Sequence, residues 1–265
     1  MQSFIPDPRI FYTDTGRRDG PPVVLIHAFP MSHEMWLPQV EPLNEHWRVV
    51  TYDVRGLGRS DPGEGEFTID HYVDDLFLLM DTLRIERATV AGLSMGGYIL
   101  LRAHQRDPER FAALVLASTR TQPDDDQGRQ GREKSIRDIQ SRGLRPFAED
   151  FVKKVFAPQT FTMAPQVIDH QVQVIQSHDP IGVIGALRAL AGRPDTGDTL
   201  ERIQAPTLLL FGEEDALTPP AVGRAMQGRI KGSELTVIPQ AAHLCNLERP
   251  EVFNDHLLTF LENLG

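Results

Sequence analysis

Short, unbroken apolar runs recur along the chain, and stretches with the spacing of amphipathic helices separate them. An unbroken apolar run is typical of a strand that is buried on both faces of a parallel sheet. Such runs occupy residues 23–26, 48–52, 88–91, 112–117, 206–212 and 235–239, and residues 10–13 are also β-prone. Apolar residues at helical spacing predict helices over residues 32–43, 68–83 and 250–264. Strands that alternate with helices imply a mostly parallel sheet with right-handed crossovers, so the sequence predicts an α/β fold with a central sheet flanked by helices.

The pattern changes between residues 120 and 194. Gln, Arg, Asp and Gly dominate the first part of this segment, and helical fragments without a strand continue to Ala191. A segment of this length that lacks a strand signal cannot extend the sheet. We therefore predict that residues 120–194 form a helical cap, or lid, inserted over the carboxyl ends of the strands. Residues 1–119 and 195–265 would then form the core domain.

Composition narrows the choice of function. The chain has 265 residues, of which 40% are hydrophobic and 24% charged, and its net charge is −10. This charge argues against a nucleic-acid partner, because binding phosphates requires a basic surface. The first residues carry neither a basic leader nor an apolar stretch, so no signal peptide or membrane partner is expected. The single cysteine, Cys245, excludes an internal disulfide and is expected to be a small buried side chain, and the expected location is cytoplasmic.

The segment around Ser94 carries the first candidate chemistry. The apolar run that ends near Ala91 leads into Gly92-Leu93-Ser94-Met95-Gly96, and a helix-competent segment follows. The glycines two residues before and after the serine would allow a sharp turn that presents the hydroxyl group. A Gly-x-Ser-x-Gly string is weak evidence alone, but the strand before it and the helix after it are independent support.

Two further residues could supply the base and the acid that a serine nucleophile needs. A serine hydroxyl needs a base within hydrogen-bond reach, and a third group must orient that base. Asp215 and His243 each follow a predicted buried strand, where ligands gather in open α/β sheets. Glu213 and Glu214 compete with Asp215 for the acid role, and the Gly-x-x-Asp spacing favours Asp215.

These motifs resemble the α/β-hydrolase superfamily over nearly the whole chain outside the predicted cap. The segments that carry the resemblance are His27-Ala28-Phe29-Pro30, Tyr52-Asp53-x-Arg55-Gly56-x-Gly58-x-Ser60, Gly92-x-Ser94-Met95-Gly96-Gly97, Gly212-x-x-Asp215 and His243. The stretch from His243 to Pro250 is similar to the serine esterase and lactonase branch that contains the 3-oxoadipate enol-lactonases. Ala28 departs from the pattern, since relatives usually carry glycine there, and its methyl group is expected to narrow the oxyanion pocket.

The resemblance implies a mechanism with named roles. Ser94 would attack an ester or lactone carbonyl while His243 takes its proton and Asp215 orients the imidazole. The backbone N–H groups of Phe29 and Met95 would form the oxyanion hole, and water would then release the acyl group. No cofactor or metal is expected, because no His, Cys or carboxylate grouping has ligand spacing.

The sequence also leaves functions other than ester or lactone hydrolysis open. Carbon-carbon bond hydrolases and perhydrolases on this fold also keep a serine, and some relatives are triad-retaining receptors or signalling proteins with little turnover. The expected partner is a small-molecule ester or lactone, and the sequence leaves the acyl and alcohol specificity and the oligomeric state open.

A basic stretch inside the predicted cap has two interpretations. Residues 129–145 contain six basic and two acidic side chains, a local charge of +4. They could form a solvated helix face or attract an anionic substrate. Under the second interpretation, reversing the charges of Arg132 and Arg137 would raise KM for acidic esters alone.

Further residues are expected to be structural. Asp53, Arg55 and Arg59 would form a buried loop network, and His27 would order the oxyanion loop. Trp36 and Trp47 would lie in the core.

Overall fold

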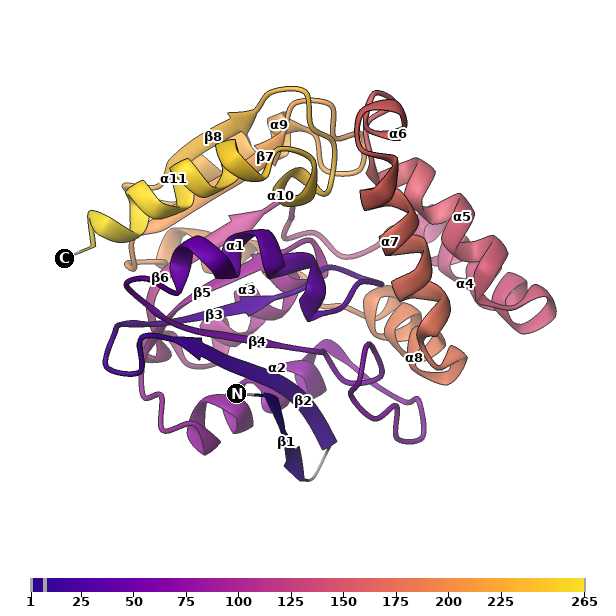
Figure 1. The fold of residues 1–265 in the computed structure, drawn as a ribbon, viewed down its shortest axis with the longest axis horizontal. Helices are drawn as coiled ribbons and strands as arrows, with labels where there is room; N and C mark the ends of the chain where they lie inside the picture. Colours follow the sequence, from indigo (N-terminus) through magenta and orange to yellow (C-terminus); the bar gives the residue numbers. More distant parts are fainter. Residues whose placement is uncertain (1, 7–8, 265) are drawn as a thin grey trace.

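An eight-stranded sheet forms the centre of the molecule (Figure 1). The computed structural model describes residues 2–6 and 9–264. The strands follow the order β1-β2-β4-β3-β5-β6-β7-β8. Neighbouring strands from β4 to β8 pair in parallel, whereas β1 pairs antiparallel with β2, and β2 pairs antiparallel with β4. Their bounds are β1 Gln2–Pro6, β2 Arg9–Gly16, β3 Pro22–Ile26, β4 Arg48–Tyr52, β5 Ala88–Leu93, β6 Phe111–Ala117, β7 Thr207–Gly212 and β8 Glu234–Ile238.

Burial of the sheet on both faces explains the unbroken apolar runs. Val24 and Ile26 of β3 belong to one apolar cluster, whereas Val23 and Leu25 belong to the other. Because successive side chains of a strand point to opposite faces, a sheet covered on both sides needs apolar residues at every position. The predicted α/β architecture with a mostly parallel sheet is confirmed.

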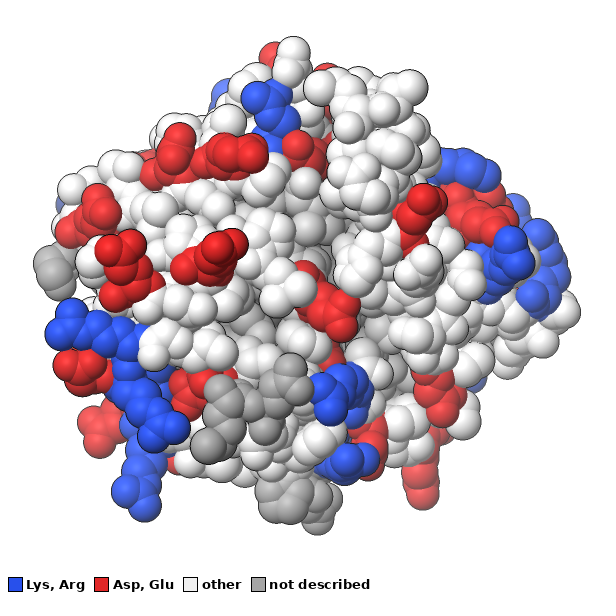
Figure 2. All heavy atoms as spheres, viewed as in Figure 1, with Lys and Arg blue, Asp and Glu red and all other residues white. Residues whose placement is uncertain are grey.

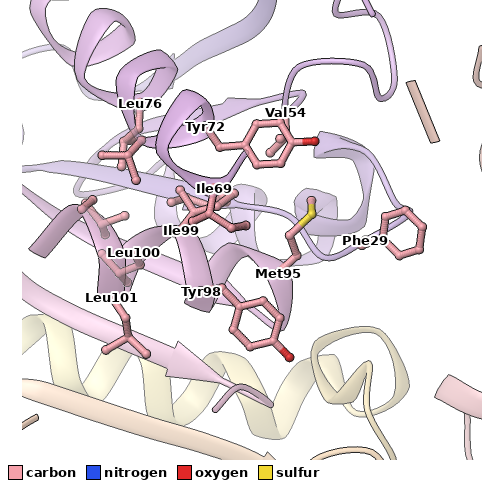
Figure 3. Packing of buried hydrophobic residues seen from close by; sticks show 14 of the residues in the cluster. Phe29, Val54, Ile69, Tyr72, Leu76, Met95, Tyr98, Ile99, Leu100 and Leu101 are labelled. Atoms are coloured by element: carbon pink, nitrogen blue, oxygen red, sulfur yellow. The ribbon is translucent and has the colours of Figure 1, made fainter. Parts of the chain in front are cut away.

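Helices cover both faces of this sheet. α2 (Ile69–Thr82) and α3 (Met95–Arg106) pack side chains such as Tyr72 and Leu100 into the first cluster (Figure 3). α1 (Leu37–Leu43) and α11 (Pro250–Glu262) contribute to the second cluster. The remaining elements outside the cap are η1 His33–Trp36, η2 Pro108–Arg110, η3 Gly197–Arg202, α9 Pro220–Gln227 and α10 Cys245–Glu248. Within the described residues, no helix is both long and apolar enough to cross a membrane.

Strand β1 was not predicted. It pairs only with β2, at the edge of the sheet. Its sequence, Gln-Ser-Phe-Ile-Pro, has only two apolar residues, which are adjacent and followed by proline, so it shows neither an apolar run nor an alternation. The other strands and the three predicted helices lie where the sequence places them, with ends that differ by a few residues.

Five helices, here named the cap helices, lie between β6 and β7. They are α4 Asp126–Arg142, α5 Leu144–Val155, α6 Thr160–Met163, α7 Pro165–Ser177 and α8 Pro180–Ala191. Every residue from 118 to 206 is described, and none of them belongs to a strand. The cap helices gather beyond one end of the sheet (Figure 1). The domain boundaries at residues 119/120 and 194/195 stay a prediction.

The turn at Ser94 is closely packed. A Cβ atom on Gly92 would overlap the backbone of Gly96, and one on Gly96 would overlap the carbonyl group of Ile26 in β3. Ser94 itself has φ 54° and ψ −108°, a conformation that non-glycine residues rarely adopt. Glycine is therefore needed at positions 92 and 96 because no side chain fits there, whereas Ser94 is the residue with the strained backbone conformation.

Substitution of Gly92 tests this packing. Gly92→Ala should lower the free energy of unfolding by at least about 2 kcal/mol, because the backbone of Gly96 cannot yield as a side chain can. Gly131→Ala in α4 is the control, since nothing lies within 4 Å of the added Cβ. It should raise the free energy of unfolding by about 0.5–1 kcal/mol, because alanine favours a helix. Urea denaturation measures both, and equal effects would contradict the packing argument.

Candidate active site

A cavity of about 800 Å³ lies between the strand ends and the cap helices. Phe29 follows β3, Ser94 follows β5 and His243 follows β8, and all three line this cavity. The wall also includes residues of α4, α5 and α8, such as Phe147 and Leu187. Ligands of parallel α/β sheets bind outside the carboxyl ends of the strands, which makes this cavity the candidate active site.

His243 and Asp215 form a buried hydrogen-bonded pair. His243 Nδ1 lies 2.8 Å from Asp215 Oδ2, which also accepts the Thr218 hydroxyl at 2.5 Å. Asp215 Oδ1 accepts the backbone N–H groups of Leu217 at 2.8 Å and Thr218 at 3.0 Å. Burial would raise the pKa of Asp215, but the hydrogen bonds from His243 and Thr218 hold it below its ordinary value. Asp215 is therefore a carboxylate at neutral pH.

The two competing acids bind elsewhere. Glu213 accepts a hydrogen bond from the backbone of Gln240, and Glu214 accepts one from the Gln159 side chain. Both glutamates are exposed. Of these three described side chains, Asp215 is the one that contacts His243.

Ser94 and His243 share the cavity without a direct hydrogen bond. Both line its wall, and Ser94 is partly exposed there. Among the contacts of the described residues, none joins the Ser94 hydroxyl to the imidazole. In unliganded enzymes such hydrogen bonds are often long and tighten when substrate binds. The structure thus brings the predicted nucleophile, base and acid to one place.

Two backbone N–H groups are available at the same wall. Phe29 and Met95 both line the cavity, and neither N–H donates to another described residue. Met95 is the first residue of α3, where N–H groups have no partner within the helix and the helix dipole favours negative charge. Ala28 belongs to the core cluster and is not among the described residues that line the cavity. Its methyl group therefore packs in the core instead of narrowing the pocket, contrary to the expectation from the sequence.

The loop that carries His243 is held by the cap. The backbone N–H of His243 donates to the carbonyl group of Val155, at the end of α5. The Glu248 carboxylate accepts the N–H groups of Ala242 at 2.7 Å and Ala157 at 2.8 Å, and the Thr160 hydroxyl at 2.5 Å. Burial raises the pKa of Glu248. Sequence reasoning missed Glu248, because two of its three partners, Ala157 and Thr160, lie about ninety positions earlier in the chain.

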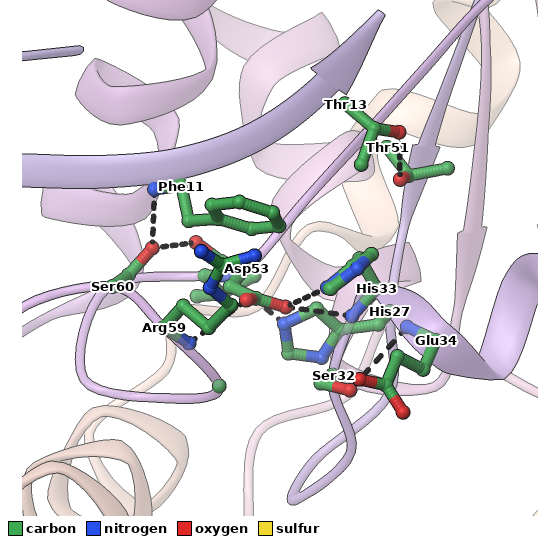
Figure 4. A network of polar contacts seen from close by, with 12 residues as sticks. Phe11, Thr13, His27, Ser32, His33, Glu34, Thr51, Asp53, Arg59 and Ser60 are labelled. Carbon is green, nitrogen blue, oxygen red and sulfur yellow. Dashed lines mark hydrogen bonds and ion pairs between the residues drawn. The ribbon is translucent and has the colours of Figure 1, made fainter. Parts of the chain in front are cut away.

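A polar network supports the oxyanion loop (Figure 4). Buried Asp53 accepts hydrogen bonds from the backbone and imidazole of His33 at 2.7 and 2.8 Å and from the Arg59 backbone at 2.8 Å. His27 Nε2 accepts the N–H of Val54 at 2.8 Å, so its Nδ1 donates to the Ala28 carbonyl group at 2.8 Å. Burial lowers the pKa of His27 to about 4. His27 thus orders the loop as a neutral imidazole.

His178 connects the cap to this network. Its Nδ1 accepts the N–H of Gly58 at 3.0 Å, and its Nε2 donates to the carbonyl group of Pro30 at 2.8 Å. The side chain is buried, and burial lowers its pKa. Sequence reasoning missed this structural role, because Gly58 and Pro30 lie more than a hundred positions earlier in the chain.

The other residues expected to be structural lie only partly as predicted. Arg59 is exposed, with its guanidinium group over the Phe11 ring, and Arg55 pairs with Asp75 instead of Asp53. Arg55 forms a bidentate pair with Asp75, with distances of 2.5 and 2.9 Å. Trp36 and Trp47 are buried in the core. Cys245 is also buried, and burial raises the pKa of its thiol to about 12. Among the described residues, no group of three or more His, Cys, Asp or Glu side chains is placed to hold a metal ion.

The basic stretch of α4 lies only partly in the cavity. Arg132 lines the cavity, but its Nε donates to Asp124 at 2.6 Å. Arg137 is exposed and is not among the described lining residues. Acidic and basic side chains both gather at the edge that α4 and α5 form (Figure 2). Arg132 and Arg137 are therefore unsuitable as a matched pair for testing anion binding.

Comparison with known proteins identifies the family. The family model described as "alpha/beta hydrolase fold" matches residues 21–250. The chain therefore belongs to the α/β-hydrolase family, and the resemblance inferred from its motifs is confirmed.

The relatives include lactonases and esterases. The chain is 29% identical to 3-oxoadipate enol-lactonase 2 of Acinetobacter baylyi, over 94% of this chain and 91% of the relative. Its structure resembles a thermophilic esterase from Thermogutta terrifontis, in a malate-bound form, with a TM-score of 0.93 and 35% identity over 97% of this chain and 94% of the other. It also resembles the enol-lactonase from Burkholderia xenovorans, with a TM-score of 0.92 and 28% identity over 99% and 100% of the two chains.

The neutral state of His27 gives the protein a pH-dependent stability. The pKa of His27 is about 4 in the folded chain and near 6.5 when exposed. The unfolded chain therefore binds more protons between these values, and the free energy of unfolding falls as the pH falls from 6.5 to 4. One pKa unit corresponds to about 1.4 kcal/mol, so the loss from this group is about 3 kcal/mol.

His27→Gln tests this assignment, because an amide keeps one donor and one acceptor but does not titrate. The variant should lose less stability than the wild type between pH 6.5 and 4, as measured by urea denaturation at several pH values. His46→Gln, at an exposed side chain, is the matched control for the substitution itself and should change the free energy of unfolding little at pH 7. Identical pH dependence in His27→Gln and the wild type would contradict the assignment.

Proposed function

We propose that this protein is a serine hydrolase that cleaves small carboxylic esters or lactones through an acyl-enzyme on Ser94. The observation that carries the proposal is the buried His243–Asp215 pair, which opens onto the same cavity as Ser94. A carboxylate that fixes the imidazole, together with a strained serine at the start of a helix, is the arrangement that nucleophilic acyl transfer requires.

Each group has one role in the proposed reaction. Ser94 Oγ attacks the carbonyl carbon while His243 Nε2 takes the hydroxyl proton, and Asp215 stabilises the imidazolium that forms. The N–H groups of Phe29 and Met95 stabilise the oxyanion of the tetrahedral intermediate. His243 then protonates the leaving alcohol, and a water molecule, activated by His243, releases the acid.

The cavity wall fits a small substrate with an apolar part. Its apolar residues come mainly from α5 and α8, and they include Phe147, Phe151, Leu187 and Leu190. A volume of about 800 Å³ is within the range of small-molecule sites. The esterases and enol-lactonases among the relatives support this substrate class.

Perhydrolysis is a second candidate. It is favoured by one relative, the bifunctional esterase/perhydrolase DCH of Acinetobacter calcoaceticus, which is 28% identical over 96% of this chain and 96% of its own length. Hydrogen peroxide would replace water in the attack on the same acyl-enzyme and would yield a peracid. The rate of peracid formation from acetate and hydrogen peroxide should be measured on the same sample as the rate of ester hydrolysis. The comparison of the two rates shows which activity is stronger.

Replacement of the nucleophile tests the main proposal. Ser94→Ala should lower kcat for p-nitrophenyl butyrate by roughly 10⁴-fold or more, because the acyl-enzyme cannot form. Ser141→Ala is the control, since its exposed hydroxyl donates to the Arg137 carbonyl group on α4. A fluorophosphonate probe should label the wild type and Ser141→Ala once per chain and leave Ser94→Ala unlabelled.

Two results would contradict the proposal. Labelling or turnover that persists in Ser94→Ala would identify another nucleophile. One equivalent of product followed by no further turnover in the wild type would indicate a receptor that retains the triad.

A further inference from the structure

Three guanidinium groups converge on one carboxylate beside the cavity. Asp124 lies 2.6 Å from Arg193, 2.6 Å from Arg132 and 3.5 Å from Arg120. The Asp124 side chain is 2% exposed, so its carboxylate is largely shielded from bulk water. A single carboxylate cannot neutralise three guanidinium groups, and the cluster therefore carries an excess of positive charge.

Two of these arginines make short hydrogen bonds to the carboxylate, one to each oxygen. Arg193 Nη1 donates to Asp124 Oδ1, and Arg132 Nε donates to Asp124 Oδ2. Arg193 is also buried and donates further hydrogen bonds to the carbonyl groups of Gln122 and Leu190. Because Gln122 precedes α4 and Arg193 follows α8, these contacts fasten the two ends of the cap helices together. Arg132 and Arg193 therefore have structural partners.

Arg120 has no comparable partner. Its Nε is buried, and no acceptor among the described residues lies within hydrogen-bond distance of it. Its ion pair with Asp124, at 3.5 Å, is long, and among the described residues no hydrogen bond joins its guanidinium group to an acceptor. The Nε atom is itself out of reach of a ligand, but the Arg120 side chain is 36% exposed and lines the cavity, so the donors available to a ligand are its terminal N–H groups.

Arg120 also lies where a substrate would bind. It lines the cavity together with Ser94 and Tyr98. Its neighbour Thr119 donates a hydrogen bond to the Ser94 carbonyl group at 2.9 Å, so the chain segment of Arg120 is fastened to the turn of the nucleophile. Guanidinium groups match the planar geometry of carboxylates.

From these observations we infer that Arg120 is a specificity-determining residue that binds a carboxylate of the substrate, so that the preferred substrates are esters or lactones that carry a second, ionised acid group. This inference rests on the proposed function and specifies its substrate class. It places the anion-binding residue outside the basic stretch of residues 129–145, on the segment that follows β6.

Other cations of the wall are less suited to this role. Arg142 and Lys154 both interact electrostatically with Asp150, and Lys134 is exposed on α4. An exposed ammonium or guanidinium group is strongly hydrated and screened by salt, so it attracts anions with little selectivity. Arg120 is part-buried, and its guanidinium group makes no hydrogen bond to an acceptor among the described residues.

Matched ester pairs test the inference. The first pair, monomethyl glutarate and methyl pentanoate, differs by a carboxylate in the acyl part. The second pair, 4-acetoxybenzoate and 4-methylphenyl acetate, differs by a carboxylate in the leaving group. Titration of the released acid gives kcat/KM for each ester. The wild type should prefer the acidic member of at least one pair, and Arg120→Met should reduce that preference roughly 10- to 100-fold, mainly through KM.

Two control variants separate contact from overall charge. Arg137→Met removes an exposed cation that lies outside the cavity and should leave the preference unchanged. Arg120→Lys keeps the charge but loses the guanidinium fork, and it should restore only part of the preference. Equal losses on acidic and neutral esters in Arg120→Met, or an unchanged preference, would overturn the inference.

A binding measurement separates this inference from the proposed function. Calorimetry should detect glutarate binding to Ser94→Ala, and the double variant Ser94→Ala/Arg120→Met should bind roughly 10-fold or more weakly. If Ser94→Ala still hydrolyses esters, the proposed function fails while this measurement still decides the role of Arg120. If hydrolysis depends on Ser94 but glutarate binds equally to both variants, the inference about Arg120 alone fails.

Discussion

The site depends on the close packing of the Ser94 turn against strand β3. Gly96 approaches the Ile26 carbonyl group so closely that no side chain fits between them, and Gly92 approaches Gly96 in the same way. This contact fixes the start of α3 relative to the sheet, and with it the hydroxyl of Ser94 and the N–H of Met95. A similar approach occurs where Gly212 meets the Ala242 carbonyl group, which brings the segments of Asp215 and His243 together. Backbone contacts, which cannot be repacked as side chains can, thus set the geometry of the candidate active site.

The cap contributes to the position of the base as well as to the cavity wall. Val155 accepts the N–H of His243, and Glu248 binds the segment after α5 and the residue before His243. His178 links the end of α7 to the loop of Pro30, next to Phe29. The arginines around Asp124 fasten the two ends of the cap helices. Three sets of polar contacts therefore tie the cap helices to the loop of His243, to the loop of Phe29 and Pro30, and to one another.

The sequence predicts the fold well where burial is symmetrical. Strands such as β3 and β7 are covered on both faces, so they appear as unbroken apolar runs, whereas β1 has only two adjacent apolar residues, which precede a proline. Asp215 and His243 could be predicted because each follows such a run, and the exposed Glu213 and Glu214 could be set aside only by the contacts in the structure. Their catalytic roles, like that of Ser94, stay a prediction.

Arg120, Glu248 and His178 could not be predicted because their roles depend on partners far away in the chain. Arg120 is distinctive only because Arg132 and Arg193 make the short hydrogen bonds to Asp124, and a sequence does not show which of three cations makes the long ion pair. The position of Arg120 was itself a usable signal, because Arg120 lies three residues after β6, at the edge of the sheet where ligands bind. The basic stretch of α4 drew attention away from it, because local charge density says nothing about which cations already have partners.

The hydrogen bond between Val155 and His243 bears on how this family can be redesigned. Exchanging the segment from α4 to α8 for that of a relative is an obvious route to a new substrate range. Here such a graft would replace the backbone acceptor that holds the loop of the base, and it would remove the donors that satisfy Glu248. A chimera of this protein therefore needs its crossover points chosen so that residues 155–160 and 242–248 come from the same parent.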